Sequence, residues 1–589
     1  MKKLRSLLST MLGAMATPAI AVIVCQGNCS TAPPNLNVGN SGGGQGSLSV
    51  TGGSVLSFGG LGAVGAFGLN QPTGITDGAM LVHGANSTVA VGGVSNSQFW
   101  VGSDGGTGVL HLSNQARLSI DAFNNPNGFG DARLYVGRNG VGRVTISDGA
   151  ELLVRDLGGW GADDDIMIGR GGNNFDGEGH VQVTTGGRLM LSGNSAYLNV
   201  ARANVSGDGS KRGVGHLTVD HGGQMLIHGG TGEGGLHIAR GDNSDGRLII
   251  KGAGSRVDMR GRYTTAWIAN DWYATTRQGS GRAELIVRDH GVLSLQSDPV
   301  PTGQLRTDMH IGFGLGHAEV TVEGGGRIEL ANGLKISTDG STGERKQFGQ
   351  LTINDTGVVS AGAYTFIGNG DASRISGVLA GTGTLISPRV ELRDGGMIAP
   401  GNSPGTLNIQ GDLTLKGGVL ELQVGGLGAG EHDVLNISGA LTVNGGTINL
   451  AFIDGFLPKA GDGFTLLQAA SIQDLATARF SFTGVAAGFQ FSLDPNGGLL
   501  SFQALNDALP VPEPQTWLLA LLGLAGLAAK ARLRFRQDAG PTIDPHLPWA
   551  TDFPRSPPAP ATTAPPASPT AAVCPRTTCA CRPWATSTS

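Results

Sequence analysis

Gly215-His216-Leu217-Thr218-Val219 opens a unit that recurs along the middle of this sequence. In each copy, a glycine and a polar residue come before two apolar residues that have one other residue between them. The other copies of this segment begin at Gly142, Gly179, Gly246, Gly281, Gly316 and Gly349, at intervals of about 31 to 37 residues. Apolar residues at alternate positions are typical of a β-strand with one buried face. Such short strands bury little by themselves, but stacked copies can share a continuous core.

A second segment of each unit ends in an apolar residue followed by Gly or Ala. Its copies are Val136-Gly137, Ile168-Gly169, Val200-Ala201, Ile238-Ala239, Ile268-Ala269, Ile311-Gly312 and Ile367-Gly368. Glycines at such turns supply the positive φ that a tight corner needs. The pattern predicts an all-β fold, a right-handed parallel β-solenoid of about 34-residue repeats. The alternative is a β-propeller, whose blades need longer units and four strands each.

The composition agrees with a β-solenoid and excludes other classes. The chain has 589 residues, 101 of them glycine, and only 14% are charged. No Gly-X-Y period accompanies the glycines, which excludes collagen, and the 39% apolar content is too high for a wholly disordered chain. A net charge of -5 with no basic block in the repeats argues against nucleic acid as a partner.

The N-terminus has the features of a secretory signal peptide, with Lys2, Lys3 and Arg5 before an apolar stretch and a small-residue site at Ala19-Ile20-Ala21. We expect a short signal helix there. The five cysteines lie outside the repeats, so no disulfide framework is expected. Cys25 and Cys29 could form a disulfide in an oxidising compartment or remain unpaired.

Near the C-terminus, Val511-Pro512-Glu513-Pro514 precedes an apolar segment, Trp517 to Ala529, and a cluster of Arg532, Arg534 and Arg536. These elements resemble the PEP-CTERM sorting signal of Gram-negative bacteria. The resemblance implies a short apolar helix that is held transiently in the inner membrane and cut by an exosortase-type membrane protease. It implies that residues 511–514 carry the recognition and that Trp517 and the arginines anchor the helix. The alternative is a permanent anchor.

The repeats resemble those of PEP-CTERM proteins and of autotransporter passengers, most clearly at Gly252-Ala253-Gly254-Ser255 and Glu284-Leu285-Ile286-Val287. Ala399-Pro400-Gly401-Asn402-Ser403-Pro404-Gly405 resembles the end of such a passenger. The predicted organisation is a signal peptide (1–21), a Gly-rich segment (22–45), solenoid repeats (46–375), a passenger-like β region (376–508), the sorting signal (511–536) and a disordered Pro/Ala/Thr tail (537–589). The tail departs from the PEP-CTERM pattern, which ends soon after the arginines.

Polar residues recur at two positions of the unit, and we expect each set to form a column on one face. The first polar column contains Arg143, His180, His216, Arg247, Arg282, His317 and Gln350. The second polar column contains Arg117, Glu151, Arg188, Gln224, Arg256 and Arg327. A ladder of guanidinium and imidazole groups could bind an anionic polysaccharide. A solvated face that discourages association is the simpler interpretation.

Tyr263, Trp267, Trp272 and Tyr273 lie within 11 residues of a chain that is only 5% aromatic. They are candidate glycan contacts, because flat rings stack on sugars, although such rings more often pack loops. Asp163-Asp164-Asp165 would suit Ca²⁺, yet no tandem calcium motif follows. We therefore expect no metal, no cofactor and no catalytic residues.

The sequence predicts a non-enzymatic protein that is exported across the inner membrane of a Gram-negative bacterium. We expect it to act as a structural or adhesive protein at the cell surface or in the extracellular matrix. Its expected partners are an exosortase-type membrane protease and an exopolysaccharide. The alternative function is a polysaccharide-binding or polysaccharide-degrading β-helix.

Overall fold

The computed structural model describes residues 21–511, except for 32–34, 40–43, 60, 67–76, 95, 123–130, 157–162, 173–174, 204–210, 242, 271–280, 299–305, 315, 339–346 and 402–403. The described residues belong to one compact unit. The predicted signal helix, the C-terminal apolar helix and the tail lie outside the described residues.

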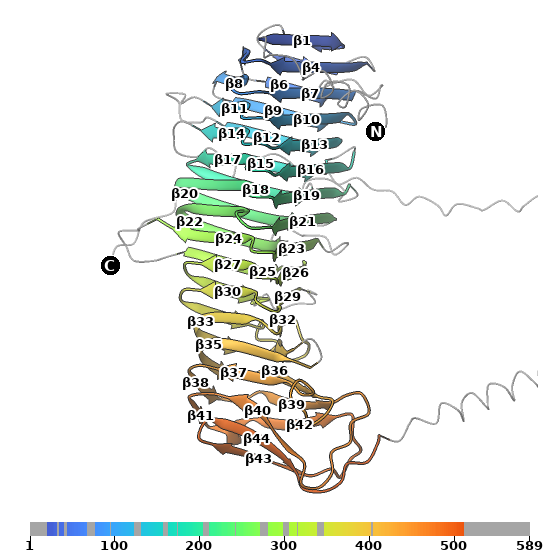
Figure 1. Cartoon of the computed structure of the whole chain (residues 1–589), viewed down its shortest axis with the longest axis vertical. Coiled ribbons are helices and arrows are strands. Elements are labelled where there is room, and N and C mark those ends of the chain that lie inside the picture. Colours follow the sequence, from blue (N-terminus) through green and yellow to red (C-terminus); the bar gives the residue numbers. More distant parts are fainter. Residues whose placement is uncertain are drawn as a thin grey trace, which may run out of the picture. The chain divides into compact units, whose positions relative to one another are not determined.

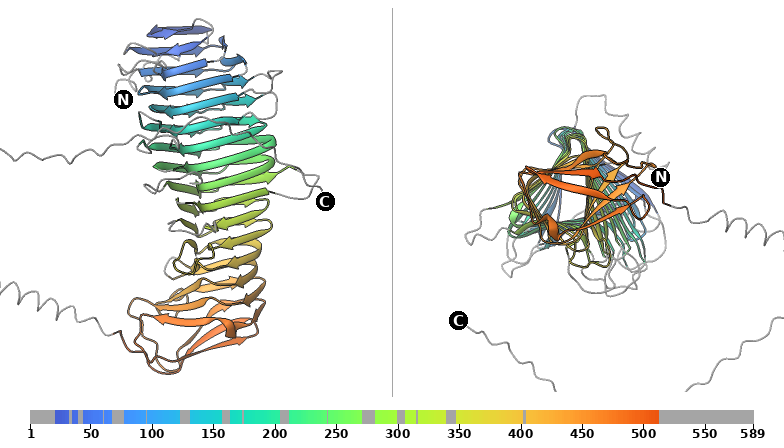
Figure 2. Two further views of the ribbon diagram at one scale, coloured as in Figure 1. Left: turned by 180° about the vertical axis from the view of Figure 1, so that it is seen from behind. Right: turned by 90° about the horizontal axis from the view of Figure 1, so that it is seen from below.

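The described chain is a parallel β-solenoid, as the repeats predict, and the β-propeller alternative is wrong. Each coil contributes one strand to each of three faces, and successive coils stack in parallel register (Figure 1). Viewed along the stack, the three faces enclose a triangular core (Figure 2). One sequence repeat is one coil. The strands β10 (Thr107–Ser113), β11 (Arg117–Ala122) and β12 (Asp131–Arg138) lie on the three faces in turn, and β13 (Val141–Ile146) returns to the first face.

The first face begins at an antiparallel strand, β1 (Val22–Gly27), and continues as parallel strands. These strands are β4 (Gln45–Thr51), β7 (Asp77–His83), β10 (Thr107–Ser113), β13 (Val141–Ile146), β16 (Gly177–Val183), β19 (Gly213–Asp220), β21 (Ser244–Lys251), β23 (Arg282–Arg288), β26 (His317–Val322), β29 (Phe348–Ile353), β32 (Gly377–Gly381), β34 (Gly396–Pro400), β36 (Val419–Val424), β39 (Thr447–Phe452) and β42 (Arg479–Thr483).

The second and third faces share some long strands, which run around the corner between them. The second face contains β5 (Val55–Phe58), β8 (Thr88–Val94), β11 (Arg117–Ala122), β14 (Glu151–Asp156), β17 (Arg188–Gly193), β24 (Val292–Ser297), β27 (Arg327–Leu330), β30 (Val358–Ala361), β37 (Val434–Ile437) and β40 (Gly463–Gln468). The third face contains β3 (Leu36–Val38), β6 (Leu61–Ala66), β9 (Asn96–Ser103), β12 (Asp131–Arg138), β15 (Asp163–Arg170), β18 (Ser195–Arg202), β25 (Arg306–Phe313), β28 (Gly333–Ile336), β31 (Tyr364–Ile367), β38 (Ala440–Val443) and β41 (Ser471–Gln473). The shared strands are β20 (Gln224–Arg240), β22 (Arg256–Asn270), β33 (Thr384–Leu392) and β35 (Thr406–Leu415).

Stacked aliphatic side chains form the core. Along the first face, Leu217 pairs with Leu248, and Leu248 pairs with Leu285, each on the next coil. All three are fully buried. Burying one leucine contributes about 1.5–3 kcal/mol, so a column of this kind supplies much of the stability of each coil. The alternation seen in the sequence therefore sets which side chains face inward.

The corner residues adopt the left-handed conformation that the sequence pattern predicts. Gly169 has a φ of 70°, and Ala201, its counterpart one coil later, has a φ of 65°. A methyl group at Gly169 would lie 1.7 Å from the carbonyl oxygen of Val214. The corner therefore brings the third face very close to β19 of the first face.

Antiparallel strands cover both ends of the solenoid. At the N-terminal end, β1 pairs with β4 and β2 (Cys29–Ser30) pairs with β3, and Cys25 and Cys29 form a disulfide. At the C-terminal end, β44 (Leu499–Ala504) pairs with β40 and β43 (Phe491–Asn496). Phe464 and Phe502 stack there with ring centroids 4.7 Å apart. The short helix Leu475–Thr477 lies between β41 and β42 in the sequence. The antiparallel strands at both ends terminate the parallel stacking of the coils.

Candidate functional site

The first polar column is only partly a single column, and this corrects the sequence prediction. Arg143, His180, His216 and Arg247 stack in register on the outer side of the first face. Arg247 then pairs with Glu284 instead of Arg282. Arg282 and His317 pair with each other, but they lie two residues away from this column along their strands. Gln350 lies in the column again, opposite Glu319.

The shift arises because the buried leucines set the register and the glycines do not. Leu248 must pair with Leu285 to keep the core filled, and this places Gly246 opposite Ala283. Gly281 lies just before β23 and has no place in the glycine column of the earlier coils. Aligning the repeats on their glycines therefore misplaced Arg282 by two residues.

The cations on the first face are matched by carboxylates. Arg143 Nη2 lies 3.2 Å from Glu178 Oε1, and Arg247 Nε lies 2.7 Å from Glu284 Oε2. Arg282 contacts Glu319 at 3.5 Å. The hydrogen bond from His317, with smaller contributions from Arg282, lowers the pKa of Glu319 against the opposing effect of burial. This face is therefore a mixed-charge surface and not a continuous basic ladder.

The second polar column stacks in register from Arg117 to Arg256 on the second face. Val292 follows Arg256, and Arg327 follows Val292. Arg188 lies 3.5 Å from Glu151 within the column. This column also has internal charge compensation.

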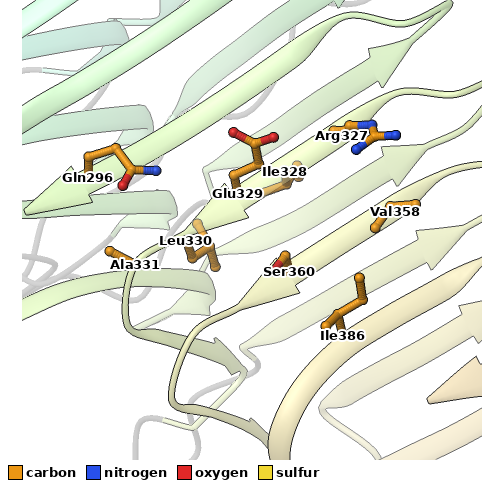
Figure 3. Close-up of a pocket in the computed structure, with 9 residues that line it drawn as sticks. All are labelled: Gln296, Arg327, Ile328, Glu329, Leu330, Ala331, Val358, Ser360 and Ile386. Carbon is orange, nitrogen blue, oxygen red and sulfur yellow. The ribbon is translucent and has the colours of Figure 1, made fainter. Parts of the chain in front are cut away.

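A groove of ≈ 390 Å³ lies where the second polar column reaches β27 and β30. Figure 3 shows Arg327 and Glu329 on one side of β27, with Ser360 on β30 beside them. Arg256 Nη2 lies 3.6 Å from the Glu329 carboxylate. The groove could hold a polar ligand. Among the described residues that line the groove, Glu329 is the one carboxylate, whereas glycoside hydrolysis uses a pair of carboxylates.

Of the four candidate glycan contacts, Tyr263 and Trp267 are described, and Trp272 and Tyr273 lie outside the described residues. Trp267 stacks on His237 with a centroid distance of 4.6 Å and faces His310 at 6.2 Å. Arg262 lies over the ring of Tyr263 at 5.3 Å. Both faces of the Trp267 indole therefore have ring neighbours in the adjacent coils, which leaves its edge for a ligand.

Trp267, His237 and His310 belong to a column on the outer side of the third face, and Tyr263 does not. We call it the aromatic column: Trp100, Tyr135, Met167, Asn199, His237, Trp267 and His310. Burial lowers the pKa of His237 well below its usual value, and the nearby Arg240 and Arg202 lower it further. Burial likewise lowers the pKa of His310 to about 4. Both imidazoles are therefore neutral at physiological pH.

A second column beside it was missed in the sequence. Arg138 pairs with Arg170, Arg170 with Arg202, and Arg202 with Arg240, on four successive coils of the third face. We call Arg138, Arg170 and Arg202 the arginine ladder. Each member directly follows a left-handed corner residue. The triplets Val136-Gly137-Arg138 and Ile168-Gly169-Arg170 could have indicated it, had the residue after the corner been included in the repeat.

The sorting motif begins where the described chain ends. Pro510 forms an antiparallel bridge with Val485 at the C-terminal cap, and Val511 is 50% exposed. Pro512, Glu513, Pro514, Trp517, Arg532, Arg534 and Arg536 lie outside the described residues. The motif thus follows immediately after the last residue tied to the solenoid.

Within the described part of the chain, no three His, Cys, Asp or Glu side chains gather as a metal site would need. The same residues contain no helix with the length and apolar character of a membrane span. Asp165 is buried and accepts a hydrogen bond from Asn199 Nδ2 at 3.2 Å.

Residues 510–536 match the family described as PEP-CTERM protein-sorting motif. No curated protein matches the chain. The match covers the C-terminal motif and not the solenoid. It implies that the protein is exported across the inner membrane of a Gram-negative bacterium and is recognised by exosortase, a membrane enzyme.

Proposed function

We propose that this protein is a non-enzymatic structural or adhesive component of the cell surface or the extracellular matrix. The sorting motif is the observation that carries the proposal. It begins at Pro510, which pairs with Val485 at the C-terminal end of the solenoid. An exported protein of this design presents long, regular faces to its surroundings. The disulfide between Cys25 and Cys29 supports an oxidising, extracytoplasmic location.

The form of the solenoid supports a scaffold role. Antiparallel strands at both its ends terminate the parallel stacking of the coils. The cations of the first face are paired with carboxylates such as Glu178 and Glu284, which favours a well-hydrated surface. Polysaccharide binding is the second candidate, because arginines occupy the same position on successive coils of the third face.

The proposed role can be tested by locating the protein in fractionated cultures. We expect the wild-type protein in the surface or matrix fraction, and we expect cells that lack it to adhere or aggregate less. Restoring the gene should restore both properties. Recovery of the protein only from the culture medium, with unchanged adhesion in cells that lack it, would contradict a surface or matrix role.

Processing gives a separate prediction. Replacing Pro512, Glu513 and Pro514 together by alanine should leave the segment Trp517–Arg536 attached, because the recognised motif is gone. The wild-type surface protein should end before Trp517. Mass spectrometry of the C-terminal peptide measures this in both proteins, and Leu509→Ala, outside the match, is the control. An intact Trp517–Arg536 segment on wild-type surface protein would rule out cleavage at this motif.

A further inference from the structure

We propose that the arginine ladder binds an acidic polysaccharide that lies along the solenoid axis, with its carboxylates or sulfates on successive arginines. This inference deepens the proposed function, since it rests on a protein that meets polysaccharides outside the cell. It depends on three features of the third face: the spacing of the ladder, its lack of carboxylate partners and the way its side chains are held.

The spacing follows from the parallel register. Arg138, Arg170 and Arg202 occupy the same position in successive coils, on β12, β15 and β18 (Figure 1). Adjacent parallel strands lie about 4.8 Å apart, so the guanidinium groups repeat at about this interval. A polyuronate carries one carboxylate per sugar and therefore repeats its charge over a similar length. Duplex DNA, with one charge per about 1.7 Å, is far denser than the ladder.

The ladder lacks the ion pairs that the chain uses elsewhere. Among the described residues, Arg138, Arg170 and Arg202 form no salt bridge, whereas Arg143 and Arg247 on the first face each have a carboxylate partner. The neighbouring positions of the aromatic column, Tyr135, Met167 and Asn199 among them, carry no charge. Like charges on adjacent strands destabilise a sheet. A bound polyanion would remove this cost.

The nearest carboxylates are engaged by other groups. Asp165 lies two residues before Met167 on β15, is 6% exposed and receives a hydrogen bond from Asn199. Asp104, in the turn after β9, accepts hydrogen bonds from Ser103 Oγ at 2.8 Å and from Asn139 Nδ2 at 2.9 Å. The ladder therefore has only partial compensation from its own side chains.

The electrostatics of Arg202 reflect this. Burial lowers its pKa to about 10, and the positive charges of Arg240 and Arg170 add to the effect. Asp165 and Tyr135 act in the opposite direction but do not offset it. An anion placed on the ladder would be attracted by several cations at once, and Arg binds carboxylate or sulfate oxygens with two parallel hydrogen bonds.

Two members of the ladder are held in place by the aromatic column. The guanidinium of Arg138 lies 5.1 Å from the ring centre of Trp100 and 5.4 Å from that of Tyr135. Arg170 Nη1 lies 3.7 Å from Met167 Sδ. Such contacts orient the guanidinium groups without neutralising them, which reduces the entropy lost when a ligand binds.

The test compares the full-length protein with Arg170→Gln/Arg202→Gln. We expect the wild-type protein to bind polygalacturonate and dextran sulfate, but not neutral dextran, and to bind more weakly as salt is raised. The double variant should lose about tenfold or more in affinity. The control Arg143→Gln/Arg247→Gln changes the same number of charges on the first face and should bind like the wild type.

Thermal unfolding keeps the result interpretable. Arg170→Gln/Arg202→Gln should melt no lower than the wild type, because two like charges are removed from adjacent strands. Should it unfold, Arg138→Gln, which leaves Arg170 and Arg202 in place, must still weaken binding. The proposal is overturned if the wild type binds neither charged polysaccharide at low salt, or if the double variant and the first-face control bind equally. Tighter binding of duplex DNA, lost in the same variant, would overturn the polysaccharide assignment.

These outcomes are independent of cell fractionation. A protein that binds polygalacturonate through the ladder but is absent from the surface fraction would refute the proposed location and not the site. A surface protein without ladder-dependent binding would refute the site alone.

Discussion

Replacing Glu391 by glutamine is expected to lower the free energy of unfolding by about 3 kcal/mol at neutral pH. The Glu391 side chain is 1% exposed. Glu391 lies on β33 and pairs in parallel register with Phe366 on β31 of the preceding coil. Arg389 contacts one of its oxygens, which also lies 2.8 Å from Lys416 Nζ. Arg393 donates to the other oxygen from Nε at 3.0 Å and from Nη2 at 2.6 Å.

The cost arises because three cations share one buried anion. Glutamine would remove the only negative charge in this cluster and place amide hydrogens against positive groups. Breaking a buried ion pair by removing one partner is strongly destabilising. Urea unfolding measures the difference. Glu329→Gln is the matched control, because its 3.6 Å contact with Arg256 is exposed to solvent and should be worth less than about 1 kcal/mol. Equal midpoints for Glu391→Gln and the wild type would refute this role.

The contribution of Glu391 should also depend on pH in a defined window. Burial by itself raises the Glu391 pKa, but hydrogen bonds from Lys416, Arg393 and Arg389 outweigh burial and lower it from 4.5 to about 2. A lowered carboxyl pKa adds stability that is complete above the unfolded value and is lost as the pH falls. The stability difference between wild type and Glu391→Gln should therefore be constant above about pH 5 and shrink between about pH 4.5 and 2.

Replacing Gly179 by valine is expected to cost about 3 kcal/mol or more, because there is no room for a side chain. A Cβ at Gly179 would lie 2.2 Å from the Val136 carbonyl oxygen and 2.3 Å from the Gly169 amide nitrogen. Both neighbours are backbone atoms of the third face and cannot rotate away. Moving them would disturb the corners of two coils at once.

The chain offers a matched control in the same column. Ala283 occupies this position two coils after Gly215, where the local backbone accommodates a methyl group. Ala283→Gly should therefore cost only about 1 kcal/mol. Urea unfolding and limited proteolysis compare the variants, and cleavage around the coil of Gly179 should be enhanced, since each coil is stabilised mainly by its neighbours. A Gly179→Val protein as stable as Ala283→Gly would show that the corner can open without cost.

Much of the fold could be predicted from local patterns. The alternation at Leu217 and Val219 recurs often enough to indicate strands, and the small residues at Gly169 and Ala201 mark the corners. The disulfide between Cys25 and Cys29 could not be predicted, because two nearby cysteines fit a paired or an unpaired state equally well. The shift at Arg282 could not be predicted either, because the Gly-Arg pair recurs in the sequence although the pairing of the buried residues places it two positions away.

The arginine ladder was harder to predict, because its members come together only when the coils stack. Tyr263 and Trp267 stand out in the sequence, whereas Arg138, Arg170 and Arg202 are about 32 residues apart and look ordinary one at a time. Their significance depends on which carboxylates lie within reach.

The sequence by itself determined that this chain is a β-solenoid with a C-terminal sorting signal, because strand periodicity, corner residues and a linear recognition motif are all local properties. Only the tertiary structure decided which cations are paired with carboxylates and that Arg138, Arg170 and Arg202 stack on successive coils. Ion pairs between coils join residues more than 30 positions apart, such as Arg143 and Glu178, and their register is set by the packing of buried leucines. A surface pattern cannot reveal that register, because the core fixes it.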